Sequence, residues 1–217
     1  MHKNTITKAE AARRGLRWCA DLQMFALERG CDSCKHSTRY CRATCYNRKF
    51  LRYPSFRKTW GPDGNDNKRW DGATTETFGG LSAVRLCTRG EPLATMADVR
   101  RLRDWAVANP ECHFWVPTRG WRDACVRREI RRYLRPLANV HVVASIDPTT
   151  PLKTVQRLQR GGWSTMYYGE HVHPNDTGDV HRCRKTWGGV KGACAECAAS
   201  GDGCFSEERV DIFLKKH

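Results

Sequence analysis

The feature that most constrains the fold is a regular alternation of apolar runs and helical patterns between Leu81 and Tyr168. Short apolar runs typical of buried strands alternate with segments whose apolar residues recur at helical spacing. A strand, a helix and a second strand in one sheet make a right-handed crossover, and a series of such units builds a parallel sheet. Strands are expected at Leu81–Cys87, His113–Pro117, Val140–Ile146 and Ser164–Tyr168, and helices at Thr95–Ala108, Gly120–Leu134 and Pro151–Arg160.

Four strands are too few for a closed eight-stranded barrel, so the pattern predicts an α/β fold with a partial (β/α) barrel or an open parallel sheet. The length of 217 residues fits one domain. We expect residues 1–80 to form a helix over Thr7–Arg29, a cysteine-rich loop and a long turn-rich loop over Tyr53–Gly80. Leu16–Leu22 is alternatively a short strand. Residues 81–172 form the β/α core, and residues 173–217 a cysteine-rich tail.

Polar residues follow the predicted strands where each apolar run stops. Glu91, Arg119 and Asp147 lie at such ends, and Arg85 lies on the first strand of the core. Parallel sheets carry their chemistry at the carboxyl ends of the strands. These four residues are therefore the catalytic candidates, although each of them alone could be a helix cap or a loop charge.

A second constraint is a group of four cysteines within fifteen residues. Thiolates this close repel one another unless a cation lies between them, and soft sulfur ligands select zinc, copper(I) or iron–sulfur clusters. Disulfide bonds are the alternative, but they need an oxidising compartment. The group, here named the loop quartet, consists of Cys31, Cys34, Cys41 and Cys45.

The sequence carries no sign of export. Met1–Ala12 is polar and charged and lacks the apolar core of a secretion signal. No stretch approaches the roughly eighteen apolar residues of a membrane-spanning helix. We therefore expect a cytoplasmic protein without a membrane partner. Twelve cysteines in that compartment indicate metal ligation in preference to disulfides.

The spacing of the loop quartet helps to distinguish a zinc site from an iron–sulfur cluster. Structural zinc sites usually pair two Cys-x2-Cys knuckles, whereas here one such pair is followed by a six-residue gap and a Cys-x3-Cys pair. An irregular loop wrapped over a cubane suits this spacing, so we expect a [4Fe-4S] cluster. Zinc remains the alternative.

A second group of four cysteines, the tail quartet, lies near the end of the chain. Part of it repeats the Cys-x2-Cys-x6-Cys spacing of the loop quartet, so a second iron–sulfur cluster and a zinc ion are both open. The other four cysteines lie within strand or helix patterns and are expected to be small buried residues. The tail quartet is Cys183, Cys194, Cys197 and Cys204, and the other cysteines are Cys19, Cys87, Cys112 and Cys125.

The chain is strongly basic, with 38 Lys and Arg against 23 Asp and Glu and a formal charge of +15. Such a balance indicates a polyanionic partner, and nucleic acid first. The arginines of one predicted helix would face outward from its apolar stripe and could bind phosphates, although a solvated helix face explains them equally. They are Arg122, Arg127, Arg128, Arg131, Arg132 and Arg135.

Several short motifs follow one another along most of the chain, from Cys34 to Cys204. They are Cys34-x6-Cys41-x3-Cys45-Tyr46, Val84-Arg85, Gly90-Glu91, Pro110, Phe114-Trp115 with Thr118-Arg119, Ser145-Ile146-Asp147, and the second cysteine cluster. Their order resembles the phage gene-product-88-like family, which tends to have Gly-Asp where this chain has Gly90-Glu91. This resemblance implies a bacteriophage protein in the host cytoplasm, with a reduced form of the radical S-adenosylmethionine barrel.

The radical enzymes that the chain resembles use three cysteines in a Cys-x3-Cys-x2-Cys loop and leave one iron open for S-adenosylmethionine. The present loop is longer, and Cys31 is available as a fourth ligand. Glu91 lies in an Arg-Gly-Glu-Pro segment similar to the Gly-Gly-Glu-Pro strand end that contacts the cofactor amine in those enzymes. If one iron is open, Glu91 is expected to help hold this cofactor. We favour closure by Cys31, because a spare thiol beside iron is rarely idle.

Three functions remain open at this point. The first is an iron–sulfur protein with redox or radical chemistry on or near nucleic acid. The second is a non-catalytic nucleic-acid-binding protein with structural iron–sulfur or zinc centres. The third is a base-exchange enzyme that uses Asp147 as its nucleophile, with zinc in the tail. The sequence gives neither the substrate nor the oligomeric state.

Overall fold

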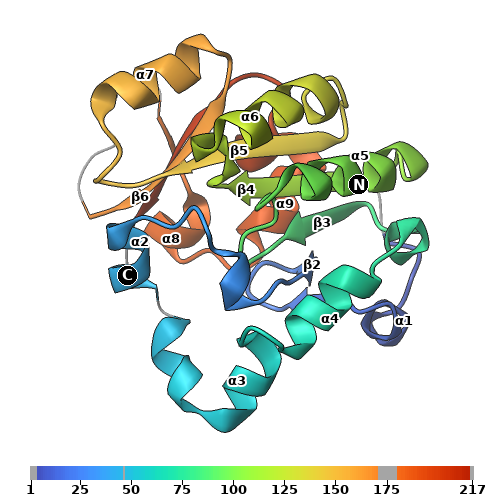
Figure 1. Ribbon diagram of the computed structural model, residues 1–217. Coiled ribbons are helices and arrows are strands. Elements are labelled where there is room, and N and C mark those ends of the chain that lie inside the picture. Colours follow the sequence, from blue (N-terminus) through green and yellow to red (C-terminus); the bar gives the residue numbers. More distant parts are fainter. Residues whose placement is uncertain (1–3, 46, 171–179, 216–217) are drawn as a thin grey trace.

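An open sheet of eight strands, most of them parallel, forms the centre of the molecule (Figure 1). The computed structural model describes residues 4–45, 47–170 and 180–215. The strand order is β1-β2-β3-β4-β5-β6-β8-β7, and β1 with β2 is the antiparallel pair. The strands are β1 (Arg17–Cys19), β2 (Met24–Leu27), β3 (Ala83–Leu86), β4 (His113–Thr118), β5 (Val140–Ile146), β6 (Ser164–Gly169), β7 (His181–Arg182) and β8 (Asp211–Lys215).

The crossover helices lie on one face of this sheet (Figure 1). They are α5 (Met96–Ala108), α6 (Ala124–Glu129) and α7 (Leu152–Arg160), and a π-helical turn over Ile130–Leu134 continues α6. Each follows a strand and precedes a parallel one, as the alternation predicted. The predicted α/β class is confirmed, in its open-sheet form.

The opposite face of the sheet is divided into two layers. Ala83, Trp115, Val143 and Met166 pack with Cys194 and Phe205 of the tail. The residues two positions further along the same strands point to the same side, because side chains alternate in a strand. This second layer, nearer the carboxyl ends, lines a cavity and comprises Arg85, Pro117, Ser145, Tyr168 and, on β8, Leu214.

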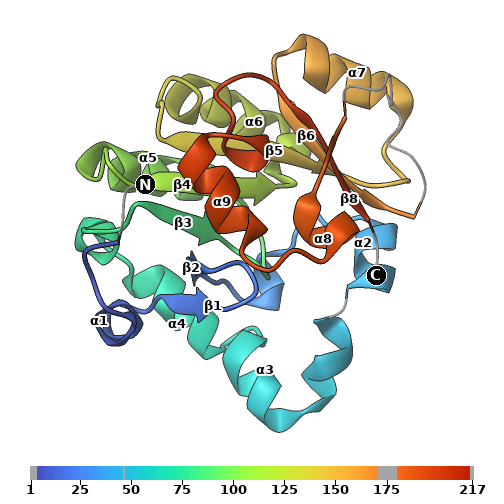
Figure 2. The same cartoon turned by 180° about the vertical axis from the view of Figure 1, so that it is seen from behind.

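The tail forms small elements that cover the first layer (Figure 2). These are α8 (Arg184–Gly188), α9 (Ala193–Ser200) and a 3-10 turn over Gly203–Phe205. Phe205 contacts Trp115 with ring centroids 5.8 Å apart. The remaining segment returns as β8 between β6 and β7.

The helix predicted over Thr7–Arg29 is wrong for most of its length. Helix α1 spans Lys8–Arg13 and ends before Gly15, whose φ of +85° suits a glycine and not the continuation of a helix. The chain then forms the β1–β2 hairpin at the sheet edge, so the alternative of a short strand within Leu16–Leu22 is closer to the structure. Pairing of β2 with β3 overrides local helix preference here.

The long loop predicted over Tyr53–Gly80 is also wrong. It contains α3 (Pro54–Trp60), α4 (Asn65–Gly72) and a 3-10 turn over Thr75–Phe78. Pro54 stands in the first turn of α3, where a missing N–H costs nothing. The two tryptophans, Trp60 and Trp70, are buried and anchor the segment, as expected.

In the described part of the chain, no helix has the length and apolar character needed to cross a membrane.

Candidate functional site

A cavity of about 360 Å³ lies at the carboxyl ends of the parallel strands. Its volume falls in the range of about 300–1,000 Å³ that small-molecule sites occupy. Its floor is the second layer of the sheet face, and its walls include Trp60, Arg89 and Glu91. We name it the loop cavity because Cys34, Cys41 and Cys45 of the loop quartet line it.

Cys31 is placed differently from the other three members of the quartet. It begins a 3-10 turn over Cys31–Ser33 and is not among the residues that line the loop cavity. Cys41 lies on α2 (Arg39–Thr44), and Cys45 caps the end of this helix. The structure therefore presents three thiols of the quartet to one cavity.

Thr38 fixes Cys41 relative to the sheet. The Thr38 hydroxyl accepts a hydrogen bond from the Cys41 N–H at 2.9 Å and donates one to Asp147 Oδ2 at 2.6 Å. Arg119 Nη1 lies 2.8 Å from the same carboxylate oxygen, and the Arg119 side chain also hydrogen-bonds the Cys41 thiol. Two strand ends, those of β4 and β5, thus hold the loop in place. A Thr directly before a helix is a capping signal, which could have identified Thr38 from the sequence.

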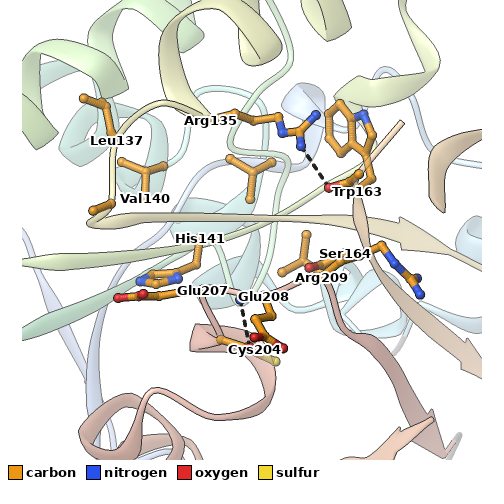
Figure 3. A pocket seen from close by; sticks show the side chains of 15 residues that line it. Arg135, Leu137, Val140, His141, Trp163, Ser164, Cys204, Glu207, Glu208 and Arg209 are labelled. Carbon is orange, nitrogen blue, oxygen red and sulfur yellow. Dashed lines mark hydrogen bonds between the residues drawn. The ribbon is translucent and has the colours of Figure 1, made fainter. Parts of the chain in front are cut away.

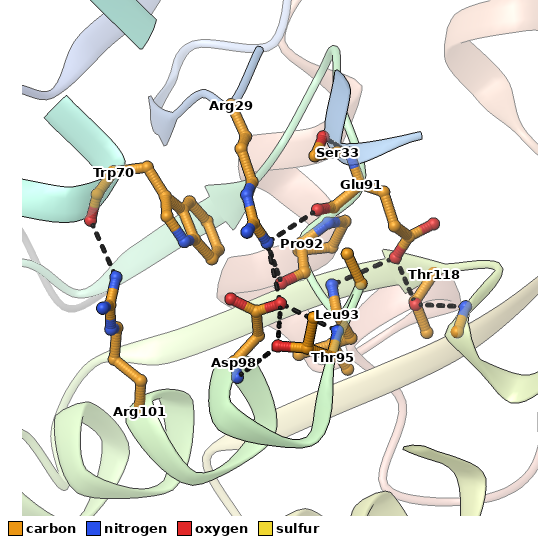
Figure 4. A network of polar contacts seen from close by, with 12 residues as sticks. Arg29, Ser33, Trp70, Glu91, Pro92, Leu93, Thr95, Asp98, Arg101 and Thr118 are labelled. Carbon is orange, nitrogen blue, oxygen red and sulfur yellow. Dashed lines mark hydrogen bonds and ion pairs between the residues drawn. The ribbon is translucent and has the colours of Figure 1, made fainter. Parts of the chain in front are cut away.

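Ser33 and Glu91 make a second attachment of the loop (Figure 4). The Ser33 hydroxyl donates to the Gly30 carbonyl at 2.6 Å and accepts from the Glu91 N–H at 2.8 Å. The Glu91 carboxylate accepts from the Leu93 N–H, the Arg119 N–H and the Thr118 hydroxyl. Glu91 therefore closes a turn between strands while one side of it faces the cavity.

The electrostatic surroundings of the quartet disfavour bare thiolates. Burial raises the pKa of Cys34 to about 12, and Glu91 together with the neighbouring thiols adds to this effect. Burial also raises the pKa of Cys41, although the Arg119 charge opposes the shift. A cation between the sulfurs reverses this balance, because metal ligation requires and stabilises the thiolate form.

The spacing of the thiols bears on which metal fits. A tetrahedral zinc ion with Zn–S bonds of about 2.3 Å holds its sulfurs about 3.8 Å apart. Among the described residues, the one group of three ligand atoms that lie within 4.8 Å of one another is His181, Cys197 and Asp202 in the tail. Among the described residues, neither the loop quartet nor the tail quartet brings three of its thiols this close together.

Arg85 is the cation of the cavity wall that lacks a carboxylate partner among the described residues. Arg89 pairs with Asp66 at 2.8 Å and Arg119 with Asp147. The Arg85 guanidinium lies 4.3 Å from the centre of the Trp115 ring, and its Nε–H is buried without a hydrogen-bond acceptor in the described chain. Such a donor suits an anionic ligand in the cavity.

Asp147 does not line the cavity, unlike the other three catalytic candidates. Its side chain is fully buried, and its second oxygen accepts from the Thr149 hydroxyl at 2.6 Å. Burial would raise the pKa of Asp147, but the hydrogen bonds from Thr149 and Thr38 and the charge of Arg119 hold this pKa below its usual value. Both oxygens would have to leave these partners for Asp147 to act as a nucleophile.

The tail quartet encloses a much smaller space. All four of its cysteines line a cavity of about 20 Å³, together with Trp115 and Phe205. This is little more than the volume that a single water occupies, about 10–15 Å³ by the same measure. Burial raises the pKa of Cys194 to about 11, and the Arg85 charge opposes this shift. The space fits one ion better than a cubane.

The predicted nucleic-acid arginines are divided between solvent and backbone. Arg128, Arg131 and Arg132 are exposed on α6 and the following turn. Arg127 donates to the Trp121 carbonyl at 2.7 Å, and Arg135 donates to two carbonyls, those of Gly161 and Gly162. The sixth, Arg122, is exposed.

Arg135 also borders a cavity of about 250 Å³ at the amino ends of β5 and β6 (Figure 3). Its wall includes His141, Trp163 and Cys204. Because parallel sheets carry their chemistry at the opposite end, this cavity is the weaker candidate for a site.

Of the cysteines expected to be buried, Cys125 is exposed, so that prediction is wrong for it and confirmed for Cys19, Cys87 and Cys112.

Comparisons of the chain with protein-family models, curated proteins and solved structures gave no match. The resemblance to the phage family therefore stays a prediction.

Proposed function

We propose that Cys34, Cys41 and Cys45 hold a [4Fe-4S] cluster and that the protein uses it in redox or radical chemistry in the loop cavity. The observation that carries this proposal is that three thiols of one loop line a cavity at the carboxyl ends of a parallel sheet. A cluster supplies one-electron transfer, and an iron without a cysteine ligand can also bind a cofactor such as S-adenosylmethionine.

We infer the open position from the lining of the cavity. Cys31 is near enough to Cys34 and Cys45 for their charges to interact, but it is not among the residues that line the cavity, which favours a cluster held by three thiolates with one iron facing the cavity. This choice reverses our preference from the sequence, which was closure by Cys31. Glu91, beside Cys34, is the carboxylate that lines the cavity, and a cofactor amine would bind it in addition to the hydrogen bonds that it already accepts from Leu93, Thr118 and Arg119.

Named residues of the chain would support this chemistry. Thr38, Arg119 and Asp147 hold the loop against two strand ends and so fix the thiols relative to the cavity floor. Arg85 offers a buried N–H and a positive charge to the anionic part of a ligand. Trp60 and Met166 add apolar surface to the lining of the cavity.

The tail quartet is proposed as a separate, structural centre. Its four cysteines line one space of about 20 Å³, and Cys197 lies in the one close group of possible metal ligands among the described residues, with His181 and Asp202. A bound ion would cross-link α8, α9 and the 3-10 turn that cover the sheet face. The resemblance to the phage family leads us to propose a bacteriophage origin as well.

Anaerobic purification with iron, sulfide and zinc analysis tests the proposal. The expected result is a brown protein with iron and sulfide, zinc in a separate stoichiometric amount, and a spectrum that shifts when S-adenosylmethionine is added. A Cys125→Ser variant is the matched control, because Cys125 is exposed and does not line the cavity. A colourless protein with zinc alone, expressed with adequate iron, would contradict the cluster.

A further inference from the structure

The segment from Ser33 to Pro62 has an unusual charge composition. It contains eight Lys and Arg residues and no Asp or Glu. The arginine-rich stretch from Arg122 to Arg135, by contrast, contains Asp123 and Glu129. The cysteine loop and the elements that follow it therefore carry their positive charge without an acidic residue between the cations, and this part borders the loop cavity through Asn47 and Trp60.

Exposed aromatic rings lie within this positive segment. Phe50 and Tyr53 are 37% and 46% exposed. Lys49 lies 5.2 Å from the Phe50 ring centre and Arg52 lies 4.8 Å from that of Tyr53. Rings in solvent beside cations are suited to stack on nucleic-acid bases while the cations contact phosphates.

An aromatic series joins this surface to the cavity. The Phe50 ring lies 6.3 Å from that of Tyr53 and 5.7 Å from that of Phe56, and Phe56 lies 6.0 Å from Trp60. Trp60 lines the cavity, and its buried indole N–H has no acceptor in the chain as described. The rings thus extend from solvent to the cavity wall at Trp60.

We propose that this surface binds a single-stranded nucleic acid at the mouth of the loop cavity. We name it the basic–aromatic surface, formed by Arg48, Lys49, Phe50, Arg52 and Tyr53 with α3. Stacking on Phe50 and Tyr53 requires free base faces, which a single strand has and a duplex hides. The absence of acidic residues from Ser33 to Pro62 gives the charge complementarity for a phosphate backbone.

The position of the basic–aromatic surface makes the bound nucleic acid a candidate substrate of the loop cavity. This role as substrate rests on the proposed function. A strand stacked on Phe50 lies one ring, Phe56, away from the cavity wall at Trp60. A nucleotide entering from there would meet Arg85, whose N–H and charge suit a phosphate. Binding itself needs only the surface and not the cluster.

Fluorescence anisotropy with a labelled single-stranded 16-mer and its duplex tests the inference. The Phe50→Ala/Tyr53→Ala variant should lose about tenfold or more in single-strand affinity, since stacking on one ring is worth about that much. Lys49→Gln/Arg52→Gln should flatten the slope of log affinity against log salt by about 1.4, at about 0.7 for each contact. Arg128→Gln/Arg131→Gln removes the same charge elsewhere and should leave the slope unchanged.

Unchanged single-strand affinity in the ring variant, with a native circular dichroism spectrum, would overturn the inference. Tighter binding of the duplex, or binding of anionic phospholipid vesicles without binding of the 16-mer, would also overturn it. Metal analysis of the same samples separates this inference from the proposed function. A protein without iron that binds the 16-mer contradicts the cluster alone, whereas an iron-loaded protein that does not bind it contradicts the surface alone.

Discussion

The two cysteine quartets share part of their spacing but differ in their surroundings. Three thiols of the loop quartet line a cavity of about 360 Å³, whereas all four thiols of the tail quartet surround about 20 Å³. The loop quartet lies above the second layer of the sheet face, and the tail quartet packs on the first layer. Closed thiolate sites support structure, and sites that keep an open position support reactions. We therefore propose that the shared spacing serves two roles, a reactive centre in the loop and a structural centre in the tail.

Arg85 connects the two regions. It lines the loop cavity, and its charge also acts on Cys194 and Cys204 of the tail quartet. Its neighbour on the sheet face, Trp115, packs against Phe205 of the tail. A change of charge at the tail quartet therefore also acts on Arg85, the residue that we propose to bind an anion in the loop cavity.

The largest expected effect is the independent loss of each centre. Cys34→Ser should abolish iron and sulfide binding and leave zinc in the tail. Cys197→Ser should abolish zinc binding and leave iron and sulfide in the loop. It should also destabilise the fold, because structural metal sites contribute folding energy. Elemental analysis of both variants, with Cys125→Ser as the control, measures this. Loss of both metals in Cys34→Ser would show that the quartets do not act separately.

A smaller effect is expected on the free energy of unfolding as the pH falls. Burial, with His113 at 2.9 Å, lowers the pKa of His141 from 6.5 to about 4. Below pH 6.5 the unfolded chain therefore binds a proton that the folded chain excludes, and stability falls as the pH drops to about 4. The loss is at most about 3 kcal/mol.

The loop side should respond in a lower pH range. Asp147 has its pKa held below 3.8, so its contribution is present above this pH and is lost as the pH falls further. Urea unfolding at pH 7 and pH 5 measures the loss of stability that we expect from His141, because Asp147 stays ionised at both pH values. His141→Asn should show a smaller loss between these values than the wild type, and an equal loss in both would rule out His141 as the cause.

The smallest effect is expected from Cys31→Ser. If three thiolates hold the cluster, this variant keeps its iron and sulfide and still shifts its spectrum with S-adenosylmethionine, as the wild type does. If Cys31 is a ligand, the wild type does not respond, and the variant loses the cluster or gains a response. Absorbance and electron paramagnetic resonance spectra of both proteins, prepared anaerobically, distinguish the two cases.

The core of the fold could be predicted because its signals are local. Apolar runs such as that of Val140–Ile146, and helix limits such as the Thr95 cap, are properties of neighbouring residues. The β1–β2 hairpin and helices α3 and α4 could not be predicted in this way. Their formation depends on pairing with β3 and on the burial of Trp60 and Trp70, which are contacts between distant parts of the chain.

By itself, the sequence determined the α/β class, the strand ends where polar groups collect, and the two cysteine quartets. Only the tertiary structure decided that Cys31 lies outside the cavity that the other three thiols line. It also decided that Asp147 holds the loop in place and that Phe50 and Tyr53 lie in solvent, joined to the cavity wall at Trp60 through the Phe56 ring. Spacing along the chain fixes which residues are available, but the direction in which a side chain points depends on packing between elements that are far apart in sequence.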